Sequence, residues 1–367
     1  MITVPVQLVV WAVWNLTESA ISIGIAMLAG RAPLWLLALL GAGLADRFGA
    51  YRLLSIANAS AVFVVACFLV QDVFLGSSPT SYILFLFFLN ATRSIEGAAL
   101  AVIIQEDGGH IDVQKGNAKF DIAKRMGRLV APLFATSFGK VKTIIFVFGG
   151  SVAYFVMAFT ASISSQCSPR RIEKGQHVSF QAAFGGVLGS APLRQLFLVS
   201  CIYPICHAAA WFVAIPRLAL GASNGQADVL GYIVAASGIG GLLSGFLILK
   251  WVVWGPHKAV GFGVILAGAS FAAFSSSSIG LLAVFLGFLI GMALPFQDVF
   301  MTIIIQQNAQ SGTLARVQAL WRLAAEISLG IGLVAGGWST EYLGATAVLL
   351  VSGICAALLG IYMISKK

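Results

Sequence analysis

The sequence has 367 residues, of which 59% are hydrophobic and only 10% are charged, and its mean hydropathy is +0.95. A soluble protein of this length needs more charged surface, so the composition excludes that class and indicates lipid as the solvent. The net charge of +9 would suit a nucleic-acid-binding protein. In a membrane protein it indicates basic cytoplasmic loops instead.

Apolar runs long enough to cross a bilayer recur along the whole chain. They predict spans at 20–44, 52–70, 81–104, 119–138, 143–161, 193–214, 229–249, 259–276, 279–304, 316–338 and 343–363. A shorter run, ITVPVQLVVWAVW, stands at the start and is interpreted as the outer half of a first helix whose beginning is missing. The expected fold is all-α and integral to the membrane. It has two pseudo-symmetric helical bundles of about six spans each, with a truncated first helix.

A polar stretch from Ser162 to Gln195 divides the chain into halves of similar size. It predicts an N-terminal transmembrane bundle at 1–161, a cytoplasmic linker at 162–192 and a C-terminal transmembrane bundle at 193–367. Within this stretch, VSFQAAFGGVL is either a short amphipathic helix on the inner membrane face or a plain connector. The five cysteines lie mostly in apolar runs without metal-ligand spacing, so they are expected to be core thiols.

The distribution of basic residues predicts the orientation. Ten lysines and arginines fall on one side of the predicted spans: Arg47, Arg52, Lys115, Arg170, Arg171, Lys174, Lys250, Lys258, Lys366 and Lys367. The other side holds little beyond Lys140, Lys142 and Arg217. The basic side is therefore expected to be cytoplasmic, and it includes the C-terminus.

The two halves share a weak internal repeat. Val102–Gly127 aligns without a gap on Ile303–Ser328, so that Lys115 falls on Arg316 and Phe120 on Trp321. Two parallel halves around a central loop are typical of secondary transporters, whose substrate path runs between the halves.

The stretch GAGLADRFGAYRLL, residues 41–54, places charges and glycines on a cytoplasmic turn between two spans. Gly43, Asp46, Arg47, Gly49 and Arg52 resemble the signature loop between the second and third helices of the major facilitator superfamily. Arg93 and Gly97 in NATRSIEGAALA resemble that family's R-x-x-x-G element. The order LTESAISIG, GRAPLWLL, PLRQLFL and GTLARVQALWR looks like the bacterial export branch, which includes enterobactin-type siderophore exporters and macrolide and multidrug efflux pumps.

Gly43 and Gly49 suit a tight turn and close helix approach. The resemblance implies that Asp46 meets the start of the eleventh helix near Ser311–Thr313 and holds the two halves together on the cytoplasmic side. Such a contact would stabilise the outward-open state, because free N–H groups and a partial positive charge lie at a helix N-terminus. The alternative is that Asp46, Arg47 and Arg52 only determine the topology.

Charged groups inside spans are costly and usually face a cavity or a partner, so they are the candidates for a substrate and proton pathway. The candidates are Arg31, Arg93, Glu96, Asp298, Arg322 and Glu326. Arg31 either faces the pathway or snorkels to the outer interface. Glu96 and Glu326 are either proton carriers or halves of permanent ion pairs with Arg93 and Arg322. Asp298 is the first choice for a proton carrier, since its own helix carries no basic neighbour.

Two further features remain open. His207 in the seventh span is either a hydrogen-bonded interior residue or a proton relay. Six aromatic residues either line a cavity or serve as packing and interface groups: Trp11, Trp14, Trp211, Phe212, Phe296 and Trp321.

The sequence has no GxxxxGK[ST], HExxH or metal-ligand cluster, and no GxSxG elbow with triad partners. It therefore predicts no enzyme activity, no cofactor, no metal and no nucleic-acid partner. The expected function is secondary active transport by a monomer in the bacterial cytoplasmic (inner) membrane. The protein is expected to export a small amphipathic molecule, such as a drug, a siderophore or a similar metabolite, by alternating access and proton antiport. The expected partners are a small-molecule substrate, protons and the lipid bilayer. The alternatives are a proton-coupled uptake permease, or a non-transporting sensor or scaffold on a transporter fold.

Overall fold

The computed structural model describes residues 3–76, 78–107, 156, 180–222, 228–251, 255–277, 280–309 and 314–365. Every regular element within these ranges is a helix. Seven of the described helices are long and apolar enough to cross a membrane. The chain is an all-α, multi-pass membrane protein, as its composition predicts. The spans expected at 119–138 and 143–161 lie outside the described residues, apart from residue 156.

The chain divides into two compact units. The first comprises Met1–Glu18 and Ile25–Ile172, and the second comprises Ser19–Gly24 and Glu173–Lys367. The first few residues of one helix thus group with the second unit, although the rest of that helix belongs to the first.

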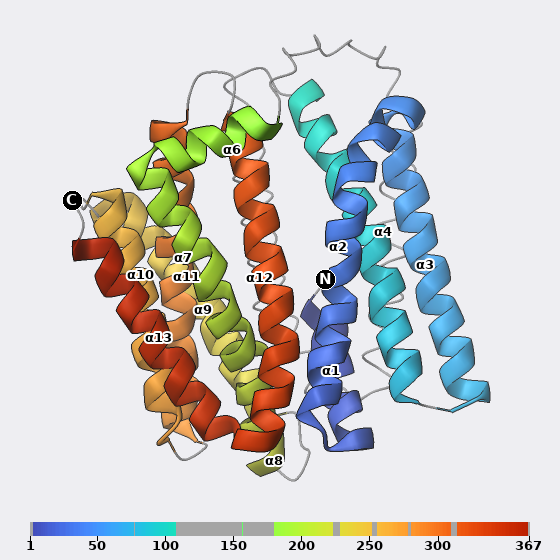
Figure 1. The fold of residues 1–367 in the computed structure, drawn as a ribbon. Coiled ribbons are helices and arrows are strands. Elements are labelled where there is room, and N and C mark those ends of the chain that lie inside the picture. The colour runs from blue at the N-terminus through green and yellow to red at the C-terminus, as the bar shows by residue number, and fades with distance from the viewer. Residues whose placement is uncertain are drawn as a thin grey trace. The chain divides into compact units, whose positions relative to one another are not determined.

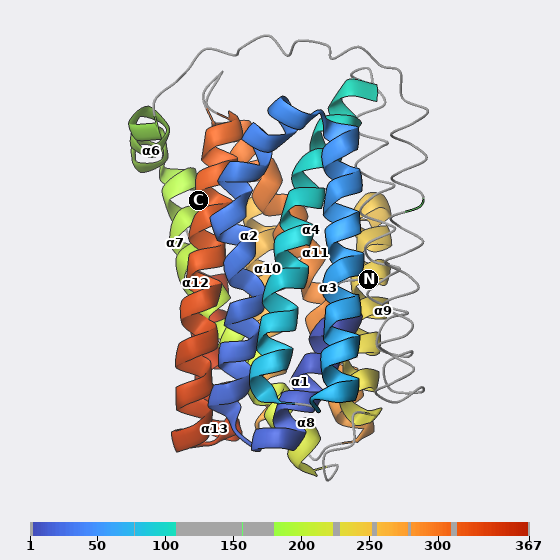
Figure 2. The same cartoon turned by 90° about the vertical axis from the view of Figure 1, so that its right-hand side faces the viewer.

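The first unit contains α1 (Thr3–Thr17), most of α2 (Ala20–Phe48), α3 (Ala50–Phe74) and α4 (Pro79–Asp107). Helices α3 and α4 run side by side in both views (Figures 1 and 2). Phe68 of α3 stacks on Phe85 of α4, with ring centroids 4.2 Å apart. Gly49 joins α2 to α3 with a φ of 78°, a left-handed conformation that favours glycine, so the glycine of the signature loop makes the turn.

The second unit contains nine helical elements in its described part. They are α6 (Phe180–Gly189), α7 (Ala191–His207), the π-helix η1 (Ala208–Ala214), α8 (Ile215–Ala222), α9 (Asp228–Trp251), α10 (Pro256–Phe274), α11 (Leu281–Asn308), α12 (Leu314–Leu343) and α13 (Ala345–Ser365). Helix α6 falls on the segment for which a short helix was one of two expectations. The span expected at 193–214 is a continuous run of α7, η1 and α8, extending over Ala191–Gly221.

Small residues let the helices of the second unit pack closely. A Cβ on Gly268 of α10 would lie 2.6 Å from the carbonyl oxygen of Gly353 in α13. A Cβ on Gly353 would lie equally close to the carbonyl oxygen of Gly268. Neither position therefore accepts a side chain, which is typical of helix interfaces in membranes.

The outer faces of the helices carry large apolar side chains, as lipid-facing surfaces do. Phe63 of α3 is 70% exposed and Phe246 of α9 is 66% exposed. The cysteines differ in part from the expectation of core thiols, because Cys67 and Cys355 are exposed on their helices. An apolar lipid-facing surface accepts a thiol as readily as a core does, so the apolar runs alone do not separate the two positions.

Candidate functional site

Helix α4 carries a buried ion pair near its middle. A guanidinium nitrogen of Arg93 lies 2.5 Å from a carboxylate oxygen of Glu96, and the two side chains are only 9% and 11% exposed. The three-residue spacing places both on one face of the helix, as the sequence indicates. Because each charge neutralises the other, the pair can exist in a low-dielectric environment that would exclude either charge alone.

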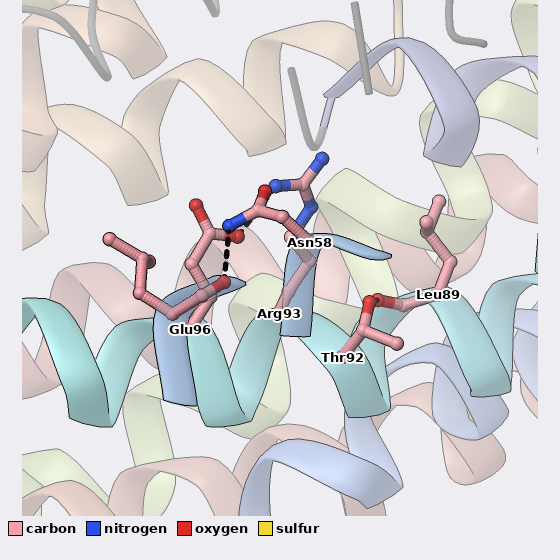
Figure 3. A network of polar contacts seen from close by, with 6 residues as sticks. Asn58, Leu89, Thr92, Arg93 and Glu96 are labelled. Carbon is pink, nitrogen blue, oxygen red and sulfur yellow. Dashed lines mark hydrogen bonds and ion pairs between the residues drawn. The ribbon is translucent and has the colours of Figure 1, made fainter. Parts of the chain in front are cut away.

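Asn58 of α3 belongs to the same network of polar contacts (Figure 3). Its side chain is 1% exposed, and its amide nitrogen donates to the carbonyl oxygen of Leu54 at 2.9 Å. Its amide oxygen is buried and has no hydrogen-bond partner. Most buried polar atoms are hydrogen-bonded, so this oxygen is an acceptor without a donor in the structure described.

The arrangement of these three side chains sets what a change of charge would do. A neutral, protonated Glu96 would lose its attraction to Arg93 and would carry an O–H donor. The amide oxygen of Asn58 is an acceptor that could receive this donor.

A second polar group lies in the second unit, where it joins α7 to α11. The amide nitrogen of Gln297 donates to the hydroxyl oxygen of Tyr203 at 3.1 Å. That hydroxyl lies 3.3 Å from Nδ1 of His207. Tyr203 is 6% exposed and Gln297 is 3% exposed, so the chain of hydrogen bonds is buried up to the half-buried imidazole.

Aromatic rings surround His207. Trp211 is nearly parallel to the imidazole, with ring centroids 6.4 Å apart. Phe212 and Phe271 approach it edge-on at 5.9 and 5.7 Å. The π-helix η1 begins directly after His207 and carries Trp211 and Phe212. A π-helical turn within an α-helix is rare and often marks a functional site.

The remaining candidates in the membrane spans occupy varied environments. Arg31 of α2 and Glu326 of α12 are half-buried, whereas Asp298 of α11 and Arg322 of α12 are exposed in this structure. Asp298 directly follows Gln297 and is close enough to Tyr203 for an electrostatic interaction. A charged group in a span avoids lipid, so an exposed Asp298 suits a water-filled path.

The candidates of the cytoplasmic loop are described only in part. Gly43, Asp46 and Arg47 lie in α2, but their side chains fall outside the described residues, as does Ser311–Thr313. Arg52 is exposed at the start of α3. The expected contact of Asp46 with the eleventh helix stays a prediction.

The six aromatic candidates fall into two groups by the exposure of their side chains. Trp14 and Phe296 are 5% exposed, so they serve in packing. Trp11, Trp211, Phe212 and Trp321 are half-buried, and the indole N–H of Trp321 donates to the hydroxyl of Ser200 at 2.6 Å.

Sequence reasoning missed Asn58, Tyr203 and Gln297. Each is a polar side chain inside an apolar run, which was the available signal, but their partners could not be identified from spacing. Within the described residues, no group of three or more histidine, cysteine, aspartate or glutamate side chains could hold a metal ion.

The chain was compared with known protein families, proteins and structures. No family model matches the chain. The uncharacterized MFS-type transporter YvqJ of Bacillus subtilis (strain 168) is 22% identical over 298 residues, which cover 78% of this chain and 70% of that protein.

Solved transporter structures resemble the whole chain. A variant of the nucleoside transporter NupG matches with a TM-score of 0.69 and 13% identity over 99% of this chain and 98% of its own. The human organic anion transporter MFSD10 matches with a TM-score of 0.66 and 13% identity over 99% and 97%. A variant of the E. coli fucose:proton symporter FucP matches with a TM-score of 0.57 and 15% identity over 100% and 98%. At these identities the likeness shows the fold.

Proposed function

Because this chain is a transporter of the major facilitator superfamily and not an enzyme, we propose that it is a secondary active exporter driven by proton antiport. Its substrate is a small amphipathic molecule, of the drug or siderophore kind, that crosses by alternating access. The observation that carries the proposal is the buried Arg93–Glu96 pair beside the unpartnered oxygen of Asn58. A carboxylate in the middle of an apolar helix is costly and usually serves a pathway or a partner, which makes Glu96 a candidate proton carrier.

The pair supports antiport by a simple exchange. With Glu96 ionised, the charges of Arg93 and Glu96 cancel, and the site is stable without a ligand. A proton on Glu96 leaves Arg93 with an uncompensated positive charge, which disfavours a cationic or lipophilic substrate nearby. Proton binding and substrate binding would therefore exclude one another, as antiport requires.

Asp298 is the corresponding candidate in the second unit. It lies within α11, is exposed, and adjoins the Gln297–Tyr203 hydrogen bond. We expect it to exchange protons with the water-filled path. Arg31, Arg322 and Glu326 are further candidates to line that path.

The resemblance to the export branch supports export as the proposed direction, and one comparison favours a second candidate. FucP is named a fucose:proton symporter, so a proton-coupled uptake permease on the same fold is the alternative. The excess of basic residues in alternate loops supports a place in the bacterial cytoplasmic membrane with the C-terminus inside, and the expected state is a monomer.

The test is transport of a lipophilic dye, ethidium, in proteoliposomes under an imposed pH gradient. Antiport moves ethidium against the direction of proton flow, whereas symport moves it in the same direction. Glu96→Gln and Asp298→Asn are expected to abolish gradient-driven movement in folded protein. Glu18→Gln is the matched control, because Glu18 is exposed at the end of α1. Gradient-driven transport that survives Glu96→Gln would contradict the proposal.

A further inference from the structure

We propose that His207 is a second proton-binding site, and that Tyr203 and Gln297 transmit its protonation state from α7 to Asp298 on α11. This inference deepens the proposed function and, in its coupling part, rests on it. His207 lies near the middle of the membrane span Ala191–Gly221. Histidine is the side chain whose unperturbed pKa lies closest to physiological pH, a property that suits a proton-binding site.

The donors and acceptors of the chain allow one arrangement in which the imidazole is neutral. Gln297 Nε2 donates to Tyr203 Oη, and the hydroxyl proton of Tyr203 can donate to Nδ1 of His207. Nδ1 is then the acceptor nitrogen of a neutral imidazole, with the ring proton on Nε2. We assign this arrangement to the deprotonated state of His207.

A proton bound at Nδ1 reverses this direction. Nδ1–H becomes a donor, so Tyr203 Oη must accept from it and turn its own hydroxyl proton toward α11. The amide of Gln297 then rotates to present its oxygen to that proton. The two buried side chains and the half-buried imidazole thus have two arrangements, and the charge of His207 selects between them. In the second arrangement the amide of Gln297, the residue before Asp298, has exchanged the positions of its oxygen and its nitrogen.

The groups around His207 leave Asp298 as the receiver of the signal. On α7, the titratable neighbours are Tyr203 and Cys206, and Cys206 contacts Cys355 of α13. On α11 the charged group is Asp298, which interacts electrostatically with Tyr203.

The other neighbouring elements contribute uncharged groups. The π-helix brings Trp211 and Phe212, and α10 brings Phe271. Helix α12 packs Gly332 and Gly336 against Ile205 and Ala209 at this level. We take Asp298 as the receiver because it interacts electrostatically with Tyr203, the side chain that contacts His207.

The first experiment measures proton binding without transport. Protonated imidazole quenches the fluorescence of a nearby indole, and Trp211 lies against the ring. We would titrate the emission of the purified full-length protein in detergent between about pH 5 and pH 8, the range in which histidine titrates. Acid is expected to quench the emission of the wild type. The part of this quenching that comes from Trp211 is expected to be absent in Trp211→Phe and in His207→Gln.

His257→Gln is the matched control, because His257 lies in the first turn of α10 and is not among the rings that contact His207. Quenching is expected to persist in it. Unchanged quenching in a folded His207→Gln protein would overturn the proton site. If His207→Gln fails to fold, Trp211→Phe serves as the test instead. Acid quenching that is unchanged after loss of the Trp211 indole would also overturn the proton site.

The second experiment tests transmission to Asp298. Tyr203→Phe keeps the aromatic ring but removes the hydroxyl that links the two helices. Acid quenching of Trp211 is expected to remain, while gradient-driven ethidium transport loses its pH dependence. Retained pH dependence in Tyr203→Phe would overturn the transmission. If the wild type quenches with acid but shows no proton-coupled transport, the proton site stands and the proposed function fails.

Discussion

The carboxylate of Glu341, near the end of α12, accepts a hydrogen bond from the backbone N–H of Ala20, the first residue of α2, at 2.7 Å. Both residues belong to the second unit. The first N–H groups of a helix have no partner within it, and they concentrate partial positive charge. Glu341 therefore caps the N-terminus of α2, although it lies 321 residues from Ala20 in the sequence. Close packing supports it, since a Cβ on Gly24 would lie 2.5 Å from the Leu333 carbonyl oxygen.

Replacing Glu341 tests this cap. Glu341→Ala is expected to lower the free energy of unfolding by about 1 kcal/mol, because the N–H of Ala20 loses its acceptor. Glu341→Gln keeps an acceptor oxygen and is expected to lose less. Thermal unfolding of the purified protein measures both. Glu18→Ala removes an exposed acid close to Ala20 in sequence and serves as the control; an equal loss in that variant would argue against a specific cap.

The ion pair on α4 predicts strong non-additivity. Arg93→Met alone leaves a buried carboxylate without its partner and is expected to cost roughly 3–5 kcal/mol. The double variant Arg93→Met with Glu96→Leu removes both charges and is expected to recover most of that loss. Denaturant unfolding of the two single variants and the double variant measures the coupling. Additive losses would show that the pair contributes nothing as a pair.

The contact between Trp321 of α12 and Ser200 of α7 gives a smaller prediction. Trp321→Phe keeps an aromatic ring but removes the indole N–H that donates to Ser200 at 2.6 Å. Ser200→Ala removes the acceptor. Each change is expected to cost about 1 kcal/mol, with little further loss in the double variant. A full second loss in the thermal unfolding of the double variant would contradict a direct interaction.

The interface of α10 and α13 is expected to reject any side chain at its glycines. Gly268→Ala forces a Cβ against backbone atoms of α13, so we expect a loss of about 1–3 kcal/mol in unfolding free energy. Gly245→Ala in α9 is the control, because no atom lies within 4 Å of the position its Cβ would occupy. That substitution is expected to be neutral or stabilising by about 0.5–1 kcal/mol. Equal effects at the two positions would contradict the role of close packing.

Much of the fold could be predicted from local sequence patterns. The apolar runs predict membrane-spanning helices because length and hydropathy decide that property with little help from tertiary contacts. The turn at Gly49 was predicted because its glycine and its charges follow one another directly in sequence. The π-helix could not be predicted, since Ala208–Ala210 favours an ordinary α-helix and the π conformation depends on neighbouring helices.

The candidate site was predictable only where its residues share one helix. Arg93 and Glu96 are three apart, so helix geometry places them together. Gln297 and Tyr203 are 94 residues apart, and their hydrogen bond depends on how α7 packs against α11. Asn58 had no charge to draw attention to it, and its importance comes from an oxygen left without a donor after folding.

The π-helix also changes how this part of the chain responds to the loss of one residue. Each residue of an α-helix turns the chain by about 100°, and a π-helical turn accommodates an additional residue within a continuous helix. Deleting one alanine from Ala208–Ala210 would let the segment return to α-helical geometry, so α8 would keep nearly its present orientation relative to α7. The same deletion in an ordinary α-helical part of this span would turn everything after it by about 100°. A one-residue deletion is thus expected to be better tolerated within the π-helix than elsewhere in the span.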